Sequence, residues 1–220
     1  MDLEHTAEDI AQLLEEDIVL CRILPRERLP EDQLMERFGT KRHVIRKALQ
    51  LLATTGVLEH IPNKGAQVRA FSPDEVRNLY DLRALLETEA ASKIPLPLTP
   101  EAEEKLREAQ SVHDAAVEAD DPARIFRANI AFHRELFSLC PNPFLVEAVE
   151  MASRRAHGIR FAALGDPDAV REAREQHYAM IAAAVEGRRD DLIRLCREHL
   201  PASGEAYLRL TAPLARRATR

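Results

Sequence analysis

Five dipeptides that each pair a helix-capping residue with a proline divide the C-terminal part of the chain more sharply than any other feature. They are Ser72-Pro73, Thr99-Pro100, Asp121-Pro122, Asn142-Pro143 and Asp166-Pro167. A Ser, Thr, Asp or Asn side chain caps the free N–H groups of a first helical turn, and proline suits the next position because no N–H is needed there. Runs of roughly 20 residues with apolar side chains at helical spacing follow these dipeptides. This spacing predicts an antiparallel bundle of about six helices, over about 73–93, 100–118, 122–139, 143–163, 167–186 and 188–210.

The first seventy residues have a different pattern. Two short β-rich runs flank a Pro/Asn/Gly turn, which is a hairpin signal. The elements expected there are a helix over about 6–22, a turn in PRERLP, helices over 31–38 and 42–54, and strands over 57–61 and 66–69. This order predicts a winged helix. The chain is therefore expected to be mainly helical, with a winged helix-turn-helix domain over 1–71 and an all-helical domain over 72–220.

The composition narrows the class of protein. Hydrophobic residues make up 45% and charged residues 31% of the chain, as in globular domains and unlike disordered ones. The N-terminus lacks the apolar core of a secretory signal, and no uncharged run approaches the roughly 20 residues that a membrane span needs. Three cysteines without CxxC spacing, Cys21, Cys140 and Cys196, favour reduced thiols. Membrane, secreted disulfide-rich and fibrous proteins are thereby excluded, and a cytoplasmic location is expected.

Charge is distributed unevenly along the chain. The formal net charge is −6, and residues 1–36 carry eleven acidic and three basic side chains. Residues 37–69 carry seven basic side chains and one acidic side chain. A compact basic stretch inside an acidic protein is expected of a localised phosphate-binding surface, although a solvated helix face would account for it equally well.

The basic residues cluster where a helix-turn-helix reads DNA. Its second helix enters the major groove with its first residues toward the base edges. Arg42 and Arg46 are four residues apart on one helical face, and arginine can bond guanine through two hydrogen bonds. The residues predicted to contact DNA are Lys41, Arg42, His43, Arg46 and Lys47 on this helix, and Lys64 and Gly65 at the hairpin tip. Each charge alone fits a solvated surface, but their joint placement favours DNA binding.

The segment LPRERLPEDQLMERFGTKRHVIRKALQLLATTGVLEHIPNKGAQV resembles the winged helix of the GntR superfamily of bacterial regulators. The matching positions include Pro25, Leu29, Glu31, Leu34, Phe38, Gly39, Arg42, Arg46, Ala48, Leu49, Leu52, Gly56, Pro62, Asn63 and Gly65. The resemblance implies that Arg42, Arg46 and Gly65 contact DNA. The departures are Arg26, Lys41, His43, Val44 and Lys47, and an arginine that some members use on the preceding helix is Asp32 here. These departures affect the expected operator sequence more than the DNA-binding class.

Polar residues interrupt the apolar stripes of three helices expected in the C-terminal part. Asn129 and His133 are four residues apart on one helix, and His177 and His199 lie on two others. A single histidine inside a bundle is more often a hydrogen-bonded core residue than a ligand. Three histidines on three helices, with an amide one turn before the first, predict a convergent site for a divalent metal ion.

This part of the chain resembles the all-helical FCD domain of the FadR-type branch of the same regulators. The run Arg83-Ala84-Leu85-Leu86-Glu87 is similar to the motif with which that domain opens, with the acid one place later. The resemblance implies that His133, His177 and His199 hold a metal ion, and zinc or nickel is expected.

One departure from the FCD pattern affects the expected ligand. Asn129 stands where the usual residue is an aspartate. A neutral amide weakens metal binding and leaves the site more positive, which favours an anionic effector. Arg83 is either a clamp for a carboxylate of that effector or an ordinary helical partner of Glu87, and both interpretations stay open.

These features predict a homodimeric transcription regulator that binds a pseudo-palindromic double-stranded DNA operator and a small organic acid. A dimer is expected because two winged helices that read half-sites gain specificity. The rival is a metal-dependent hydrolase or metal-sensing helical protein that uses the three histidines, although no HExxH motif is present. A purely structural helical adaptor would need an inert basic stretch. The direction of regulation is left open.

Overall fold

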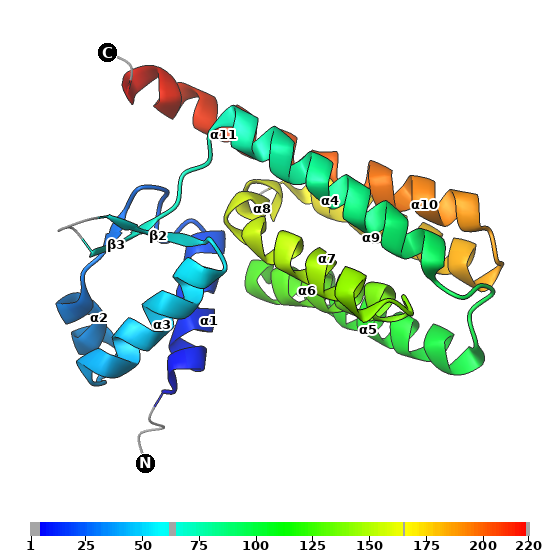
Figure 1. Ribbon diagram of the computed structural model, residues 1–220, viewed down its shortest axis with the longest axis horizontal. Coiled ribbons are helices and arrows are strands. Elements are labelled where there is room, and N and C mark those ends of the chain that lie inside the picture. The colour runs from blue at the N-terminus through cyan, green and yellow to red at the C-terminus, as the bar shows by residue number, and fades with distance from the viewer. Residues whose placement is uncertain (1–4, 62–64, 165, 219–220) are drawn as a thin grey trace. The chain divides into compact units, whose positions relative to one another are not determined.

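The computed structural model describes residues 5–61, 65–164 and 166–218. Contacts between its residues divide the chain into two compact units, and the elements of each are labelled in Figure 1. The first unit comprises Met1–Ser72 together with Arg154–Phe161, and the second comprises Pro73–Ser153 together with Ala162–Arg220. No helix among the described residues is both long and apolar enough to cross a bilayer.

The N-terminal part of the first unit is a winged helix-turn-helix. Its elements are α1 (Ala7–Val19), β1 (Arg28–Leu29), α2 (Glu31–Phe38), α3 (Arg42–Thr54), β2 (Leu58–Ile61) and β3 (Gly65–Val68). Ile10 and Leu14 of α1 pack with Ile45 and Leu52 of α3, and all four are buried. The apolar faces of α1 and α3 therefore form the core, and the opposite face of α3 is left in solvent.

The turn between α2 and α3 depends on one glycine. Gly39 has a φ of +59°, in the left-handed region that residues with a side chain rarely adopt. Its N–H donates to the carbonyl of Met35 and closes α2. Lys41 then enters α3 with extended backbone and no side-chain cap. The tight turn places the first residues of α3 at the surface.

The sheet has one strand more than the predicted hairpin. The strands are antiparallel in the order β1-β3-β2, so β3 lies at the centre. Arg28 and Leu29, expected to lie in a turn, pair with Gln67 and Ala66 of β3. Leu29 is buried in the core, which holds the strand in place. Two residues are too short for an alternating pattern, so the sequence carried no signal for this strand.

Eight helices follow residue 72 among the described residues. They are α4 (Pro73–Lys93), α5 (Pro100–Glu118), α6 (Pro122–Ser138), α7 (Pro143–Arg155), α8 (His157–Leu164), α9 (Pro167–Val185), α10 (Arg189–Glu198) and α11 (Pro201–Ala218). Five of them, α4, α5, α6, α7 and α9, begin where the proline dipeptides predict. Thr99, Asp121 and Asp166 each accept a hydrogen bond from a backbone N–H of the first turn that follows. The side chain of Asn142 does the same for Phe144 and Leu145, at 3.2 Å each. The prediction of all five starts is confirmed.

Two of the six predicted helices are interrupted. The helix expected over 143–163 breaks at Ala156 into α7 and α8, and the one expected over 188–210 breaks after His199 into α10 and α11. Pro201 explains the second break, because it has no N–H to donate to the carbonyl four residues earlier. The first break contains no proline, and the sequence pattern runs through it unmarked.

The core of the second unit lies between these helices. Figure 1 shows α4 running alongside α10, and α5 alongside α6, as the residue contacts also indicate. The largest side chains that are fully buried there include Ile94, Leu106, Phe132, Leu136, Met180, Ile181 and Leu192. His113, His133, His177 and Gln110 are buried among them, and His133 and His177 belong to the site described below.

Candidate nucleic-acid interface and metal centre

The outer face of α3 presents the predicted reading residues. Lys41, Arg42, His43, Arg46 and Lys47 are all exposed, whereas Ile45, Ala48, Leu49 and Leu52 on the opposite face are buried. Lys47 pairs with Glu8 of α1 through an Nζ–Oε1 contact of 2.8 Å. Gly65 begins β3, and Lys64 lies outside the described residues.

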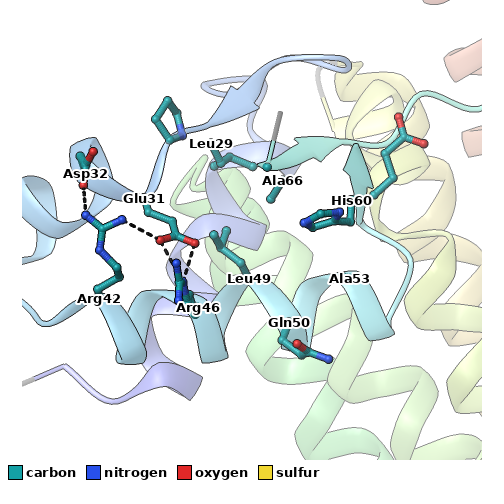
Figure 2. Close-up of a pocket in the computed structure, with 13 residues that line it drawn as sticks. Leu29, Glu31, Asp32, Arg42, Arg46, Leu49, Gln50, Ala53, His60 and Ala66 are labelled. Atoms are coloured by element: carbon teal, nitrogen blue, oxygen red, sulfur yellow. Dashed lines mark hydrogen bonds and ion pairs between the residues drawn. The ribbon is translucent and has the colours of Figure 1, made fainter. Parts of the chain in front are cut away.

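Two carboxylates of α2 hold the two central arginines of α3, as Figure 2 shows. Glu31 accepts from Arg46 Nε at 2.9 and 3.0 Å and from Arg42 Nη1 at 3.2 Å. Asp32 accepts from Arg42 Nη2 at 2.5 Å. The hydrogen bond from Arg46 holds the pKa of Glu31 below its ordinary value, and the charge of Arg42 adds to the effect. Arg42 and Arg46 thus have defined orientations at the surface.

These side chains line a groove of about 950 Å³ between α2, α3 and the sheet. Glu31, Asp32, Arg42 and Arg46 lie at one end, and His60 and Ala66 lie on the strand side (Figure 2). Sequence reasoning found the arginines but not their acidic partners. The signal was present in the acids at the start of α2, which follow the proline that precedes this helix.

The three predicted histidines converge in the second unit. His133 comes from α6, His177 from α9, and His199 is the C-terminal cap of α10. The Nε2 atom of His133 lies 3.0 Å from Nε2 of His199 and 3.3 Å from Nε2 of His177. One ring nitrogen of each histidine lies within 4.8 Å of those of the other two. Nitrogens that share a tetrahedral zinc ion at roughly 2.0–2.1 Å are about 3.3 Å apart, so these residues fit a divalent metal.

Two of the three histidines, His133 and His177, are buried, and neutral amides face two of the rings. His177 is fully buried, and its ring stacks on Phe132 with centroids 4.0 Å apart. Gln110 Oε1 lies 2.9 Å from Nδ1 of His177, and Gln176 Oε1 lies 2.6 Å from Nδ1 of His199. Both Nδ1 atoms face amides, which leaves both Nε2 atoms directed into the cluster.

Sequence reasoning missed two residues beside the cluster. Gln110 and His113 of α5 are each 1% exposed, and the His113 ring lies 5.1 Å from that of His177. Burial lowers the pKa of His113, so its ring is neutral at neutral pH. The available signal was a polar interruption of an apolar stripe, since Leu106, Gln110 and His113 share one face of α5.

Two further residues were predicted to take part in this site, Asn129 as a metal ligand and Arg83 as an effector contact. Asn129 is half-buried on α6, one turn before His133 and on the same face. Arg83 is buried on α4, where its guanidinium contacts Oε1 of Glu87 at 2.9 Å and lies over the Tyr80 ring. The ion pair, one of the two interpretations of Arg83, is therefore observed, and an effector contact stays a prediction.

A winged helix-turn-helix on the same chain as an all-helical domain with buried histidines defines a class of one-component transcription regulators. A family model described as "Bacterial regulatory proteins, gntR family" matches residues 6–68, and one described as "FCD domain" matches residues 78–202. The chain belongs to the GntR family of transcriptional regulators, in the FadR-type branch that carries an FCD domain.

The relatives of this chain are regulators rather than enzymes. It is 28% identical over 176 residues to the Nta operon transcriptional regulator of Aminobacter aminovorans, covering 80% of this chain and 82% of the relative. It is 23% identical over 199 residues to the HTH-type transcriptional repressor RspR of Escherichia coli K12, covering 90% and 87%. A structure described as a GntR transcriptional regulator of Rhodococcus sp. RHA1 has the same fold, with a TM-score of 0.76, 20% identity and coverage of 92% and 97%.

Proposed function

We propose that this DNA-binding regulator senses a small carboxylate at a divalent metal ion held by His133, His177 and His199. The supporting observation is the convergence of three Nε2 atoms, with amide oxygens facing Nδ1 of two of the rings. Gln110 and Gln176, the hydrogen-bond partners of His177 and His199, are neutral, and so is Asn129, one turn from His133. A bound divalent ion would supply a Lewis-acidic positive charge there. Neutral protein groups leave that charge uncompensated, which favours an anionic effector.

The DNA-binding half of the proposal rests on Arg42 and Arg46. Both are exposed and directed over the groove beside α3, where a guanidinium can reach base edges. Lys41, His43, Lys47, Lys64 and Gly65 complete the proposed contact set. Two such units in a homodimer would read a pseudo-palindromic operator, one half-site each, in the cytoplasm. We assign residues 1–71 to the reading domain and 72–220 to the sensing and dimerising domain.

Metal analysis and titration test the sensing site. We expect the purified protein to contain zinc or nickel near one ion per chain, and chelator-treated protein to take up either ion. Citrate serves as a carboxylate probe: it should bind the metal-loaded protein and bind the stripped protein at least tenfold more weakly. A protein that neither contains nor takes up a divalent ion would contradict the proposal.

Duplex DNA binding tests how the two units are coupled. Operator fragments from the region upstream of the chain's own gene are suitable ligands for a gel-shift assay. Citrate should change their affinity only when metal is bound, and DNA should change the affinity for citrate by the same factor. The direction of this change decides between release and promotion of DNA binding by the effector.

A further inference from the structure

Two hydrogen-bonded triads, each made of a carboxylate, a glutamine and a histidine, include two of the three histidines of the cluster. The inner triad consists of Asp114, Gln110 and His177. Gln110 Nε2 donates to Asp114 Oδ1 at 2.8 Å, and Gln110 Oε1 lies 2.9 Å from His177 Nδ1. Gln110 is 1% exposed and His177 is fully buried.

The outer triad repeats this order of groups on α9 and α10. It consists of Glu172, Gln176 and His199. Gln176 Nε2 donates to Glu172 Oε1 at 3.1 Å, and Gln176 Oε1 lies 2.6 Å from His199 Nδ1. In both triads the carboxylate and the glutamine are four residues apart on one helix, so one helical turn supplies the pair.

The order of groups in each triad determines where the histidine proton lies. An ionised carboxylate can only accept hydrogen bonds, so the amide nitrogen must face it and the amide oxygen must face the ring. An amide oxygen can only accept, so the ring nitrogen opposite it must carry the proton. We propose that the two triads fix the proton of His177 and of His199 on Nδ1, so that both Nε2 lone pairs face the centre of the cluster.

This polarity assigns the third histidine a different role in protein stripped of metal. Two ring nitrogens about 3 Å apart attract only when one of them carries a proton. Nε2 of His133 lies 3.0 and 3.3 Å from the Nε2 atoms whose lone pairs the triads orient. His133 is therefore the ring that carries its proton on Nε2 and donates it to its neighbours. Metal entry requires that proton to leave Nε2.

The role of the triads as supports for metal ligands rests on the metal site proposed above. The triads orient the histidine rings without placing a negative charge directly beside them. In many metal sites a carboxylate accepts directly from the ligating histidine and raises its basicity. A glutamine stands between the two groups here, so each carboxylate lies one side chain farther from the ring. The amide keeps the orientation of the ring. Gln110, Gln176, Asp114 and Glu172 are thus positioning residues for the proposed metal ligands.

The two triads differ in how firmly the carboxylate is held. The Asp114 side chain is 15% exposed and also accepts from Arg174 Nε at 2.8 Å and from the Tyr178 hydroxyl. The bond to Asp114 raises the pKa of Tyr178, as expected when the carboxylate is the acceptor. Glu172 is exposed, and water can replace it as the acceptor for Gln176. Loss of Asp114 should therefore have the larger effect.

Long-range proton–nitrogen NMR of the metal-stripped, full-length protein tests the inner triad. We expect His177 to carry its proton on Nδ1 in the wild type and in Asp114→Asn, because asparagine keeps an acceptor oxygen. Asp114→Ala should populate both tautomers of His177. Glu118→Ala is the matched control. Glu118 contacts the same Arg174 at 3.5 Å, but it takes part in neither of the two hydrogen bonds that make up the inner triad. An unchanged Nδ1 proton in Asp114→Ala would overturn the proposal.

Zinc affinity gives a second readout, by competition with a chromophoric chelator. Asp114→Ala should weaken zinc binding about tenfold, the effect of losing an outer-shell partner, and Asp114→Asn should restore most of it. Glu172→Ala should weaken it about twofold to threefold, because water replaces the lost acceptor. In the wild type, added zinc should also remove the Nε2 proton signal of His133. Equal zinc affinity in Asp114→Ala and the wild type would count against the inner triad.

Two further outcomes remain decisive. If Asp114→Ala fails to fold, Gln110→Met removes the acceptor directly, and a retained Nδ1 proton on His177 in that variant overturns the proposal. If the wild type binds no zinc but shows the expected tautomers, and Asp114→Ala changes them, the triads are supported and the proposed metal sensing fails. The tautomer is read without metal, so the two failures are distinguishable.

Discussion

Helix α3 and the histidine cluster both hold nitrogen-bearing side chains in place, but α3 does so with charged carboxylates and the cluster with neutral amides. Arg42 and Arg46 are held by the carboxylates of Glu31 and Asp32 at the surface, where Arg46 is 64% exposed. His177 and His199 are held by amides, and His177 has no exposed surface. Exposed ion pairs contribute about 0–1 kcal/mol, so a competing phosphate or guanine can replace them. A buried ring with a hydrogen-bonded amide has no such substitute.

This difference suggests how one chain combines two kinds of recognition. In the winged helix-turn-helix the carboxylates of Glu31 and Asp32 hold the two arginines in place. Under the proposed function DNA would replace these carboxylates, and part of the binding free energy would be an exchange of partners. In the helical domain the three histidine nitrogens already lie close together, so the proposed metal ion would need little rearrangement of them. DNA binding at α3 should depend on salt and on single charges. Metal binding at the histidine cluster should depend on side-chain shape and hydrogen bonding.

The largest effect is expected from a substitution in the buried histidine cluster. His177→Ala should abolish measurable zinc binding and lower the free energy of unfolding by roughly 1–3 kcal/mol, because Gln110 loses a buried partner. Elemental analysis and urea unfolding of the stripped protein measure the two effects. His43→Ala, an exposed histidine on α3, should change neither quantity. Full zinc content in His177→Ala would remove this histidine from the site.

The next effect is expected on DNA affinity, with stability unchanged. Arg42→Ala combined with Arg46→Ala should weaken operator binding by roughly 10–100-fold at low salt and reduce the salt slope by about two. The free energy of unfolding should stay within about 0.5 kcal/mol of the wild type, because both side chains are exposed. Gel shifts at several salt concentrations give both numbers. Unaltered DNA binding in the double variant would instead support the alternative in which the basic stretch is an inert solvated surface.

A smaller effect of opposite sign is expected from Asp32. Asp32→Asn should strengthen DNA binding about twofold to fivefold, because Arg42 loses a competing anion and the surface becomes less negative. Glu36→Gln changes the net charge equally on the same helix and is the matched control. Fluorescence anisotropy with labelled operator resolves effects of this size. Equal gains in both variants would mean that net charge alone acts, without the contact to Arg42.

The smallest effect is expected in the pH dependence of stability. The pKa of Glu31 is lowered in the folded protein, so the stability it adds is present above its unfolded value and is lost as the pH falls through the folded one. Because Glu31 is partly exposed, we expect a difference of a few tenths of a kcal/mol between the wild type and Glu31→Gln at neutral pH. Urea unfolding between pH 7 and pH 3 should show that difference vanish toward the acid end. A constant difference would argue against the ion pairs.

Local signals in the sequence were sufficient for most of the fold. Helix starts at Pro73, Pro100, Pro122, Pro143 and Pro167 follow from capping chemistry that operates within four residues. The strand Arg28–Leu29 does not follow from local signals, because its stability comes from pairing with Gln67 and Ala66 far along the chain. The break at Ala156 was missed for a related reason, since no local residue type marks it.

The candidate sites divide in the same way. Histidines on apolar stripes pointed to a cluster, and the structure brings His133, His177 and His199 together. Their amide partners were not found, because Gln110 lies 67 residues from His177 and no motif connects them. The acids that hold Arg42 and Arg46 lie ten to fifteen residues away in the sequence and were counted only as charge. Residue types predict what can be bound, whereas pairing across helices decides how it is held.

The break after His199 places one of the three rings at a joint in the backbone. α10 ends there, and Pro201 starts α11, which is fastened to α4 by a 2.7 Å hydrogen bond between Tyr80 and Ser203. A ring within a long helix has a helical turn on both sides, whereas this one lies between the end of α10 and the start of α11. A ligand bound to His199 would therefore contact the chain at the junction of α10 and α11, and α11 is the helix that Ser203 joins to α4.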